Sequence, residues 1–248
     1  MTDCLNCQNP LQSTDSYCAS CGQPTFNLHQ SFNKVIGQML HELLDIDGRL
    51  ARTLKGLLFK PGLVSSEYRQ GKRISYTPPL RMYLVTSVLL FFVTSLFQNY
   101  TSSHPSQSAS LLLPPELLEQ IPKLMFMLLP VYAAIMHLWQ RLFNYQKTPA
   151  NNHYIFNIVF AVHIHIFSYI VIMLLLPLKL LPQDSVVYLI INTLLILFLL
   201  IYPTLAIKRF YQQSWLKSLL MGITTFFIYI NCIGLGFKAT LTFLEVLK

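Results

Sequence analysis

The sequence predicts an all-α membrane protein of about five transmembrane helices, with a small metal-binding ribbon at its N-terminus. Hydrophobic residues make up 53% of the 248 residues and charged residues only 11%, whereas soluble domains average about 25% charged residues. Four of the five cysteines lie within the first 21 residues. We therefore expect a ribbon over residues 1–27, a juxtamembrane segment over 28–79, which we call the collar, and a helical bundle over 80–248.

The four N-terminal cysteines form two CxxC pairs, Cys4 with Cys7 and Cys18 with Cys21. Two thiolates separated by two residues can bind one ion, and a second pair completes a tetrahedral sulfur site, for which zinc is the usual occupant. A disulfide pair, an iron site and a redox CxxC pair are the alternatives. Residues 1–27 hold little apolar surface, so we expect folding and metal binding to be one event.

Five stretches are long and apolar enough to cross a bilayer, which takes about 20 residues. A count of four or six stays open, because the first stretch is short and the last continues toward the C-terminus. The fifth cysteine, Cys232, lies in the last stretch and is expected to pack rather than bind metal. The five stretches are 80–97, 121–142, 154–176, 186–207 and 217–237.

The Lys and Arg residues are distributed unequally between the two sides of these spans. Fourteen of the 18 lie in residues 1–81, 141–153 and 208–217. The positive-inside rule then predicts a cytoplasmic N-terminus and an external C-terminus. Residues 1–27 contain no Lys, no Arg and no apolar run, so no signal peptide is expected. A reducing cytoplasm favours metal binding over disulfides at the four cysteines.

The collar reads as two amphipathic helical segments. Apolar residues recur at steps of three and four from Leu28 to Leu44, and Leu50, Leu54, Leu57 and Leu58 follow. The basic residues of the collar could hold it on anionic lipid, contact a protein partner, or only set the topology. These residues are Arg49, Arg52, Lys55, Lys60, Arg69, Lys72 and Arg73.

Three stretches, CLNC…YCASCGQ, DIDGRLARTLKGLLFKPG and EYRQGKRISYTPPLRMYL, together cover much of the first 90 residues. In these stretches the chain resembles a bacterial membrane family catalogued as domain of unknown function 3667. The resemblance implies a bacterial inner-membrane protein with a zinc ribbon, and it implies no activity. One departure is Gln8, which stands where the family's commoner CxxCG knuckle has glycine. The matching signature residues are the four cysteines, Gly22, Gln23, Gly48, Thr53, Leu54, Pro61, Gly62, Tyr68, Gly71, Lys72, Arg73, Tyr76 and Pro78.

The predicted spans contain no Asp or Glu, which argues against transport coupled to an intramembrane carboxylate. His163 and His165 are two residues apart, so on a helix they point about 200° apart and cannot chelate one ion by themselves. Interhelical hydrogen bonding is the expected role of such polar groups, with a haem or quinone site as the alternative. The polar candidates are His137, Asn157, His163, His165, Asn192 and Asn231.

Two features of the spans bear on packing. A stripe of small and polar residues in the fifth span predicts close helix contact, and Pro130 and Pro203 permit kinks in the second and fourth spans. The stripe comprises Gly222, Thr225, Tyr229, Cys232 and Gly236.

Known enzyme motifs are missing from the sequence, and the acidic ribbon would repel nucleic acid. We therefore expect a non-enzymatic adaptor or sensor that engages a protein partner through its zinc ribbon and collar, with membrane lipids around the bundle. The alternative is a small transporter or channel-like protein for a neutral or lipidic solute. A membrane-embedded enzyme or redox protein is the third possibility.

Overall fold

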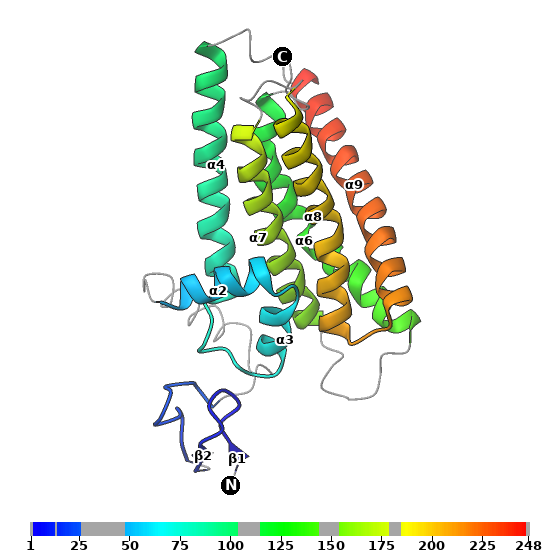
Figure 1. Cartoon of the computed structure of the whole chain (residues 1–248). Helices are drawn as coiled ribbons and strands as arrows, with labels where there is room; N and C mark the ends of the chain where they lie inside the picture. Colours follow the sequence, from blue (N-terminus) through cyan, green and yellow to red (C-terminus); the bar gives the residue numbers. More distant parts are fainter. Residues whose placement is uncertain are drawn as a thin grey trace.

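The computed structural model describes residues 2–12, 14–25, 48–103, 115–143, 154–178 and 185–246. The predicted helix over residues 28–44 lies outside these residues. The ribbon, two collar helices and a bundle of long helices follow one another along the chain, as Figure 1 shows. The ribbon lies at one end of the bundle and the last helix ends at the other.

The bundle confirms the prediction of five apolar helices. Each is long and apolar enough to cross a membrane, because each contains an uninterrupted apolar run of the required length. The chain is therefore a membrane protein. The five helices are α4 (Pro79–Ser103), α6 (Pro115–Leu142), α7 (Tyr154–Leu178), α8 (Val186–Tyr211) and α9 (Trp215–Val246).

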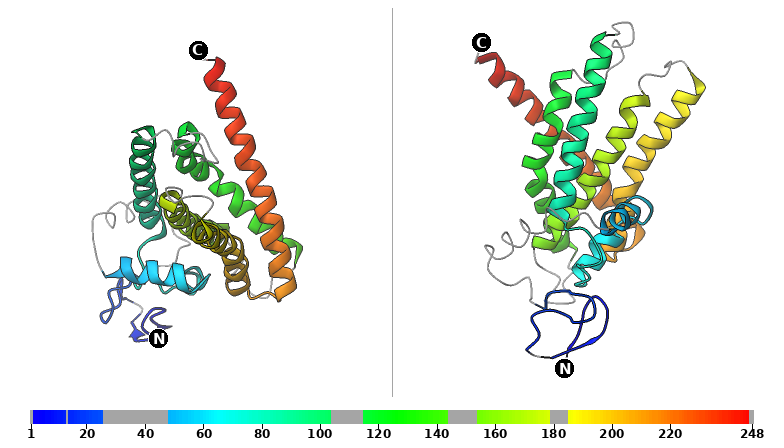
Figure 2. Two further views of the ribbon diagram at one scale, coloured as in Figure 1. Left: turned by 45° about the horizontal axis from the view of Figure 1, so that its top comes forward. Right: turned by 90° about the vertical axis from the view of Figure 1, so that its left-hand side faces the viewer.

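Helix α7 is the centre of the bundle and packs against α4, α6 and α8. More than half of its span is buried, whereas α8 and α9 expose most of theirs. Figure 2 shows α9 crossing the other helices obliquely. The exposed side chains of α8 and α9 are almost all apolar, so their free faces suit contact with lipid.

The stripe predicted in the fifth span does allow close packing. A Cβ atom at Gly222 would lie 2.4 Å from Oγ1 of Thr204 in α8, and one at Gly236 would lie 2.5 Å from a methyl carbon of Leu124 in α6. Thr225 is buried between these two points. The missing side chains of the two glycines therefore let α9 approach two helices at once.

The described part of the collar forms two short helices, α2 (Arg49–Phe59) and α3 (Leu63–Arg69), across the ribbon-side end of the bundle (Figure 1). Helix α2 buries Thr53, Gly56 and Leu57, and α3 buries Val64, Ser65 and Ser66. Both helices contact α7, and α3 also contacts α8. The collar is thus packed onto the bundle by a face of small and apolar residues.

Gly62 brings the backbone of the collar close to that of α8. Its φ angle is +72°, and a Cβ atom there would lie 2.5 Å from the carbonyl oxygen of Ala206 in α8. Arg209 donates a hydrogen bond of 2.9 Å to the carbonyl of the neighbouring Pro61. The hydroxyl of Tyr202 donates to the carbonyl of Leu57. Three residues of α8 therefore contact the end of α2 and the turn between α2 and α3.

Candidate metal centre

The two CxxC pairs form matching backbone turns. The N–H of Gln8 donates to the carbonyl of Cys4 at 2.8 Å, and the N–H of Gly22 donates to the carbonyl of Cys18 at the same distance. Both turn-closing residues are left-handed, Gln8 with φ 65° and Gly22 with φ 69°. Strands β1 (Thr2–Asp3) and β2 (Pro10–Leu11) pair antiparallel around the first turn. Each turn thus aims two thiols at the same point.

The four sulfur atoms converge on a single site. All four Sγ atoms lie within 4.8 Å of one another, with Cys4 and Cys21 3.7 Å apart and Cys7 and Cys18 3.6 Å apart. A tetrahedral zinc–sulfur site with bonds of about 2.3 Å places its sulfurs about 3.8 Å apart. Disulfide sulfurs would be about 2.05 Å apart, and all four cysteines are free. The geometry therefore fits a metal ion rather than disulfides.

The surroundings of the thiols are unequal. Backbone hydrogen bonds from Cys21 and Ser20 lower the pKa of Cys18 to about 7, whereas burial raises the pKa of Cys21 to about 11. A metal binds the deprotonated thiolate form of cysteine, so metal binding must release the proton that burial keeps on Cys21. Cys4 and Cys18 are almost wholly buried, with 2% and 3% exposure. A site closed by four sulfurs leaves no open position for a reacting water.

The left-handed residues give a first prediction. Gln8→Gly should stabilise the metal-bound ribbon by about 0.5–1 kcal/mol, because glycine adopts a positive φ without strain. Gly22→Ala should destabilise it by about 1–2 kcal/mol, because alanine is strained at a positive φ. A Cβ atom there would meet no neighbour within 4 Å, so this backbone strain is the whole expected cost. Competition of the purified protein with a zinc chelator measures both changes. Equal zinc retention in the two variants would contradict the prediction.

Gln23, directly after the second turn, attaches the ribbon to the collar. Its Nε2 donates to the carbonyl of Gly71 at 2.7 Å. Its Oε1 accepts from the backbone N–H groups of Arg73 at 3.1 Å and Ile74 at 3.4 Å. The side chain is almost wholly buried, as 6% of the residue is exposed. One amide therefore satisfies three backbone groups of residues 71–75, which we call the docking turn.

The first CxxC turn contacts the same docking turn. The hydroxyl of Ser75 donates to Oδ1 of Asn6 at 2.7 Å. Leu5 packs on Gly71, whose φ is +93°; a Cβ at Gly71 would lie 2.5 Å from a methyl carbon of Leu5. Both turns that carry the cysteines are thus seated on one collar loop. These contacts are hydrogen bonds and packing.

A second prediction follows from this contact. Gln23→Ala should weaken ribbon docking by about 1–3 kcal/mol, because it removes the three hydrogen bonds that the Gln23 amide makes with the docking turn. Zinc content should stay unchanged, since Gln23 supplies no sulfur. Faster amide exchange at residues 71–75 in mass-spectrometric hydrogen exchange would show the detachment. Gln12→Ala is the control, because Gln12 is an exposed residue at the edge of the same ribbon. Loss of zinc in Gln23→Ala would contradict the separation of the two roles.

The seven basic collar residues divide into two groups. Arg52, Lys55 and Lys60 lie toward the surface, although Arg52 also donates to the carbonyl of Ser75 at 3.3 Å. The other four, Arg49, Arg69, Lys72 and Arg73, are half-buried.

Three of the half-buried residues have identified contacts within the protein. The guanidinium of Arg69 lies 4.5 Å from the ring centre of Phe210, and that of Arg73 lies 5.7 Å from the ring centre of Tyr68. Lys72 pairs with Glu67 at 3.3 Å. Burial lowers the pKa of Arg73. Arg69 thus joins the collar to α8, and Lys72 and Arg73 make contacts within the collar, which leaves the surface group for lipid or a partner.

The six polar residues of the spans do not form one site. Asn157 is fully buried and binds three side chains at the ribbon-side end of the bundle: Gln140 at 2.8 Å, His137 at 3.2 Å and Tyr211 at 2.9 Å. Asn192 is half-buried in α8, and the exposed Asn231 donates to the carbonyl of Phe227 in its own helix.

His163 and His165 bind different partners, as their spacing predicts. His163 Nδ1 lies 2.8 Å from the hydroxyl of Ser65 in the collar. His165 lies 2.5 Å from the hydroxyl of Tyr229 in α9. His163 therefore links the bundle to the collar, whereas His165 links two bundle helices.

Sequence reasoning placed Tyr229 in the packing stripe of the fifth span but missed the other tyrosines around His165. Tyr132 of α6 packs edge-on against both His165 and Tyr229. The hydroxyls of Tyr83 in α4 and Tyr169 in α7 lie 2.5 Å apart. The signal in the sequence was the occurrence of tyrosines inside apolar spans, where a hydroxyl needs a partner. Hydrogen bonding between helices is thus the role that the structure gives these groups.

One segment of the chain matches a known protein family. The family model described as "Protein of unknown function (DUF3667)" matches residues 47–91. The matched segment contains α2, α3, the docking turn and the first half of α4, and it does not include the four cysteines. A search of curated proteins and a search of solved structures each find no match.

Proposed function

Because residues 47–91 carry the domain of a family of unknown function, we propose a function from the geometry of this chain. It is a non-enzymatic membrane adaptor or sensor. A structural zinc ion bound by Cys4, Cys7, Cys18 and Cys21 holds the ribbon in shape, and ribbon and collar together engage a protein partner. The N-terminus is cytoplasmic, as the distribution of Lys and Arg indicates.

The observation that carries this proposal is the seating of Gln23 on the docking turn. Gln23 is two residues beyond Cys21, so closure of the metal site positions the amide that binds Gly71, Arg73 and Ile74. The docking turn follows α3, whose Ser65 binds His163 inside the bundle. An unbroken chain of contacts therefore runs from the thiols to the core of the membrane domain.

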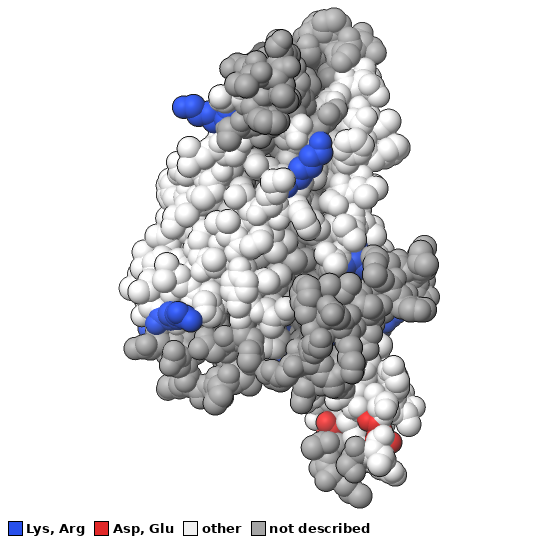
Figure 3. Space-filling view, turned by 180° about the vertical axis from the view of Figure 1, so that it is seen from behind, with Lys and Arg blue, Asp and Glu red and all other residues white. Residues whose placement is uncertain are grey.

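The ribbon also offers a surface for a partner. Tyr17 is 60% exposed between the two CxxC pairs, and exposed aromatic residues are common anchors at protein interfaces. Asp3 and Asp15 give the ribbon a negative charge, and its described residues include no Lys or Arg. Figure 3 shows acidic side chains on this protruding part of the chain and basic ones on the bundle. A partner with a basic, apolar-centred surface fits this face, and a nucleic acid does not.

The transporter alternative finds less support. It requires polar groups of several spans to line one path, but the polar residues described above are distributed over separate pairs and one small cluster. Most of these groups are engaged in hydrogen bonds across helices. The arrangement suits rigidity of the bundle more than passage of a solute.

Site-specific photo-crosslinking in cells that normally produce the chain tests the proposal. A photoreactive residue at Tyr17 should give a discrete crosslinked protein product, and the product should disappear in the Cys4→Ser, Cys7→Ser double variant. Membrane insertion should be unaffected. A photoreactive residue at Val88, 67% exposed on α4, is the control whose products should not depend on the cysteines. Identical products at Tyr17 with and without the cysteines, or no protein product, would refute the adaptor role.

A further inference from the structure

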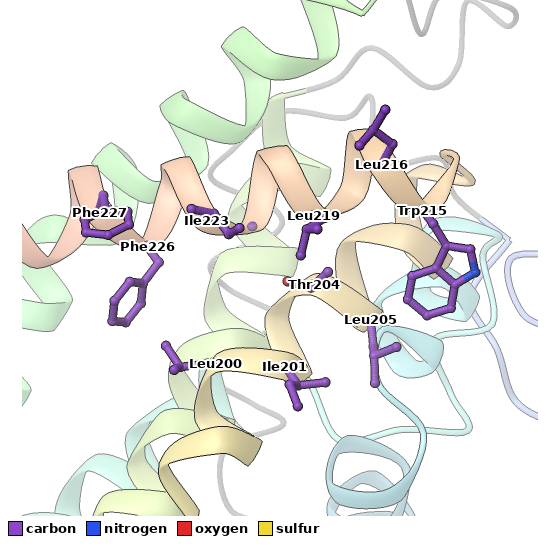
Figure 4. Close-up of a pocket in the computed structure, with 11 residues that line it drawn as sticks. Leu200, Ile201, Thr204, Leu205, Trp215, Leu216, Leu219, Ile223, Phe226 and Phe227 are labelled. Atoms are coloured by element: carbon purple, nitrogen blue, oxygen red, sulfur yellow. The ribbon is translucent and has the colours of Figure 1, made fainter.

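Helices α8 and α9 enclose a groove on the outside of the bundle. The two helices meet at the turn of residues 212–214 and touch at Gly222 and Thr204, where a Cβ would lie 2.4 Å from Oγ1. Beside this contact lies a cavity of about 770 Å³. Figure 4 shows Leu200 and Phe226 extending into the space between the helices, with Trp215 above Leu205 at the other end.

The lining of the groove selects an apolar occupant. Ten of its eleven residues are apolar or glycine, and Thr204 is the exception. Water would find too few hydrogen-bond partners there. Volumes of about 300–1,000 Å³ are typical of sites that hold a whole small ligand. The groove is therefore large enough for a long hydrocarbon chain and too apolar for a polar solute.

One end of the groove is cationic, and the other is apolar. Lys208 lies one turn beyond Thr204 on the same face of α8, and its ammonium lies 3.6 Å from the ring centre of Trp215. Arg209 and Lys217 are close to this pair along the chain, but the Arg209 guanidinium binds the Pro61 carbonyl and the Lys217 ammonium lies toward Phe143. Residues 185–244 contain no Asp or Glu. Tryptophan beside lysine is typical of the level at which lipid headgroups lie. The apolar groove thus ends beside the positive charge of Lys208 on the ribbon side of the bundle.

A second copy of the chain fits this groove less well. A helix about 10 Å wide with a rise of 5.4 Å per turn fills about 400 Å³ per turn, so the groove would hold about two turns of it. A single hydrocarbon chain is narrower and can follow the groove. A helix from another copy would also need to bring an anion to Lys208, and the predicted spans are free of Asp and Glu.

We propose that the groove between α8 and α9 binds one acyl chain of an anionic phospholipid, whose phosphate headgroup lies against Lys208 and Trp215. The lipid fills the space between the two helices and neutralises Lys208 near their turn. The site is separate from the ribbon and does not depend on the proposed partner.

Native mass spectrometry of the full chain in detergent tests the headgroup. Phosphatidylglycerol and phosphatidylcholine with identical acyl chains are titrated separately. Lys208→Gln should lower the affinity for phosphatidylglycerol about fivefold, the effect of losing one lysine beside an anionic headgroup, and leave phosphatidylcholine unchanged. Lys217→Gln is the matched control, because its ammonium lies toward Phe143, 5.3 Å from the ring centre. Equal losses in the two variants would refute a defined headgroup site.

A second pair of variants tests the acyl chain. Ile223→Trp places a large side chain in the groove and should lower the affinity for both lipids several-fold. Ile228→Trp is the control, since Ile228 lies in the same helix with similar exposure, 46% against 47%, but is not part of the lining. Unchanged lipid binding in Ile223→Trp would overturn the proposal. A dimer that survives in the wild type and is lost in Ile223→Trp would instead assign the groove to a second copy.

Discussion

The Cys4→Ser, Cys7→Ser double variant is expected to lose its zinc completely, from about one ion per chain to none, and to unfold the ribbon. Two remaining thiolates cannot close a tetrahedral site, and zinc peptides of this kind gain about 10–16 kcal/mol from the metal. The described ribbon has only two strands of two residues each, so little else could hold it folded. Elemental analysis of the detergent-purified protein measures the loss.

The control for this prediction is Cys232→Ser, which should keep its zinc. Cys232 lies in α9, far along the chain from the four clustered thiols. Hydrogen exchange should show the docking turn losing protection in the double variant and keeping it in the control. A wild-type protein purified without any metal, or with zinc retained in the double variant, would contradict the closed four-sulfur site.

Gly62→Ala is expected to destabilise the protein by about 2–5 kcal/mol at the contact between collar and bundle. The left-handed backbone, φ +72°, costs a residue with a side chain about 1–2 kcal/mol. The added Cβ would lie 2.5 Å from the carbonyl oxygen of Ala206, which is rigid backbone inside α8, and relieving such a contact costs about 1–3 kcal/mol. Thermal unfolding of the purified protein measures the combined effect.

Gly48→Ala is the matched control for this substitution. Gly48 precedes α2 with a φ of −56°, and a Cβ atom there would meet no neighbour within 4 Å, so the same change should be close to neutral. Limited proteolysis should cut the collar of Gly62→Ala faster than that of Gly48→Ala. Equal stability of the two variants would show that the collar does not depend on close contact with α8.

Several features were predictable because short segments of the sequence determine them. The spacing of Cys4, Cys7, Cys18 and Cys21 restricts the thiols to two tight turns, and those turns bring the sulfurs together wherever the rest of the chain lies. The five spans follow from the length of apolar runs, since a backbone in hydrocarbon must satisfy its own hydrogen bonds. The separation of His163 from His165 follows from helical geometry alone.

Other features depend on which distant segments meet, and hydropathy contains no information about that. The amide of Gln23 binds the carbonyl of Gly71, and His163 binds Ser65. Asn157 forms hydrogen bonds with side chains of α6 and α8. Each pair is separated along the chain, so the contact exists only once the helices are ordered around α7. The basic collar residues show the same limit, because their sequence pattern cannot distinguish a cation that faces lipid from one that lies on Phe210 or Tyr68.

By itself the sequence determined a membrane protein with five apolar helices and a four-cysteine site, because runs of apolar residues and fixed thiol spacing act locally. Only the tertiary structure decided that the ribbon is seated on the collar, that the collar is packed into the bundle, and that α8 and α9 leave a groove beside Lys208. These outcomes depend on the shapes of surfaces that meet across the fold, where one missing Cβ, as at Gly62 or Gly222, decides how closely two segments approach.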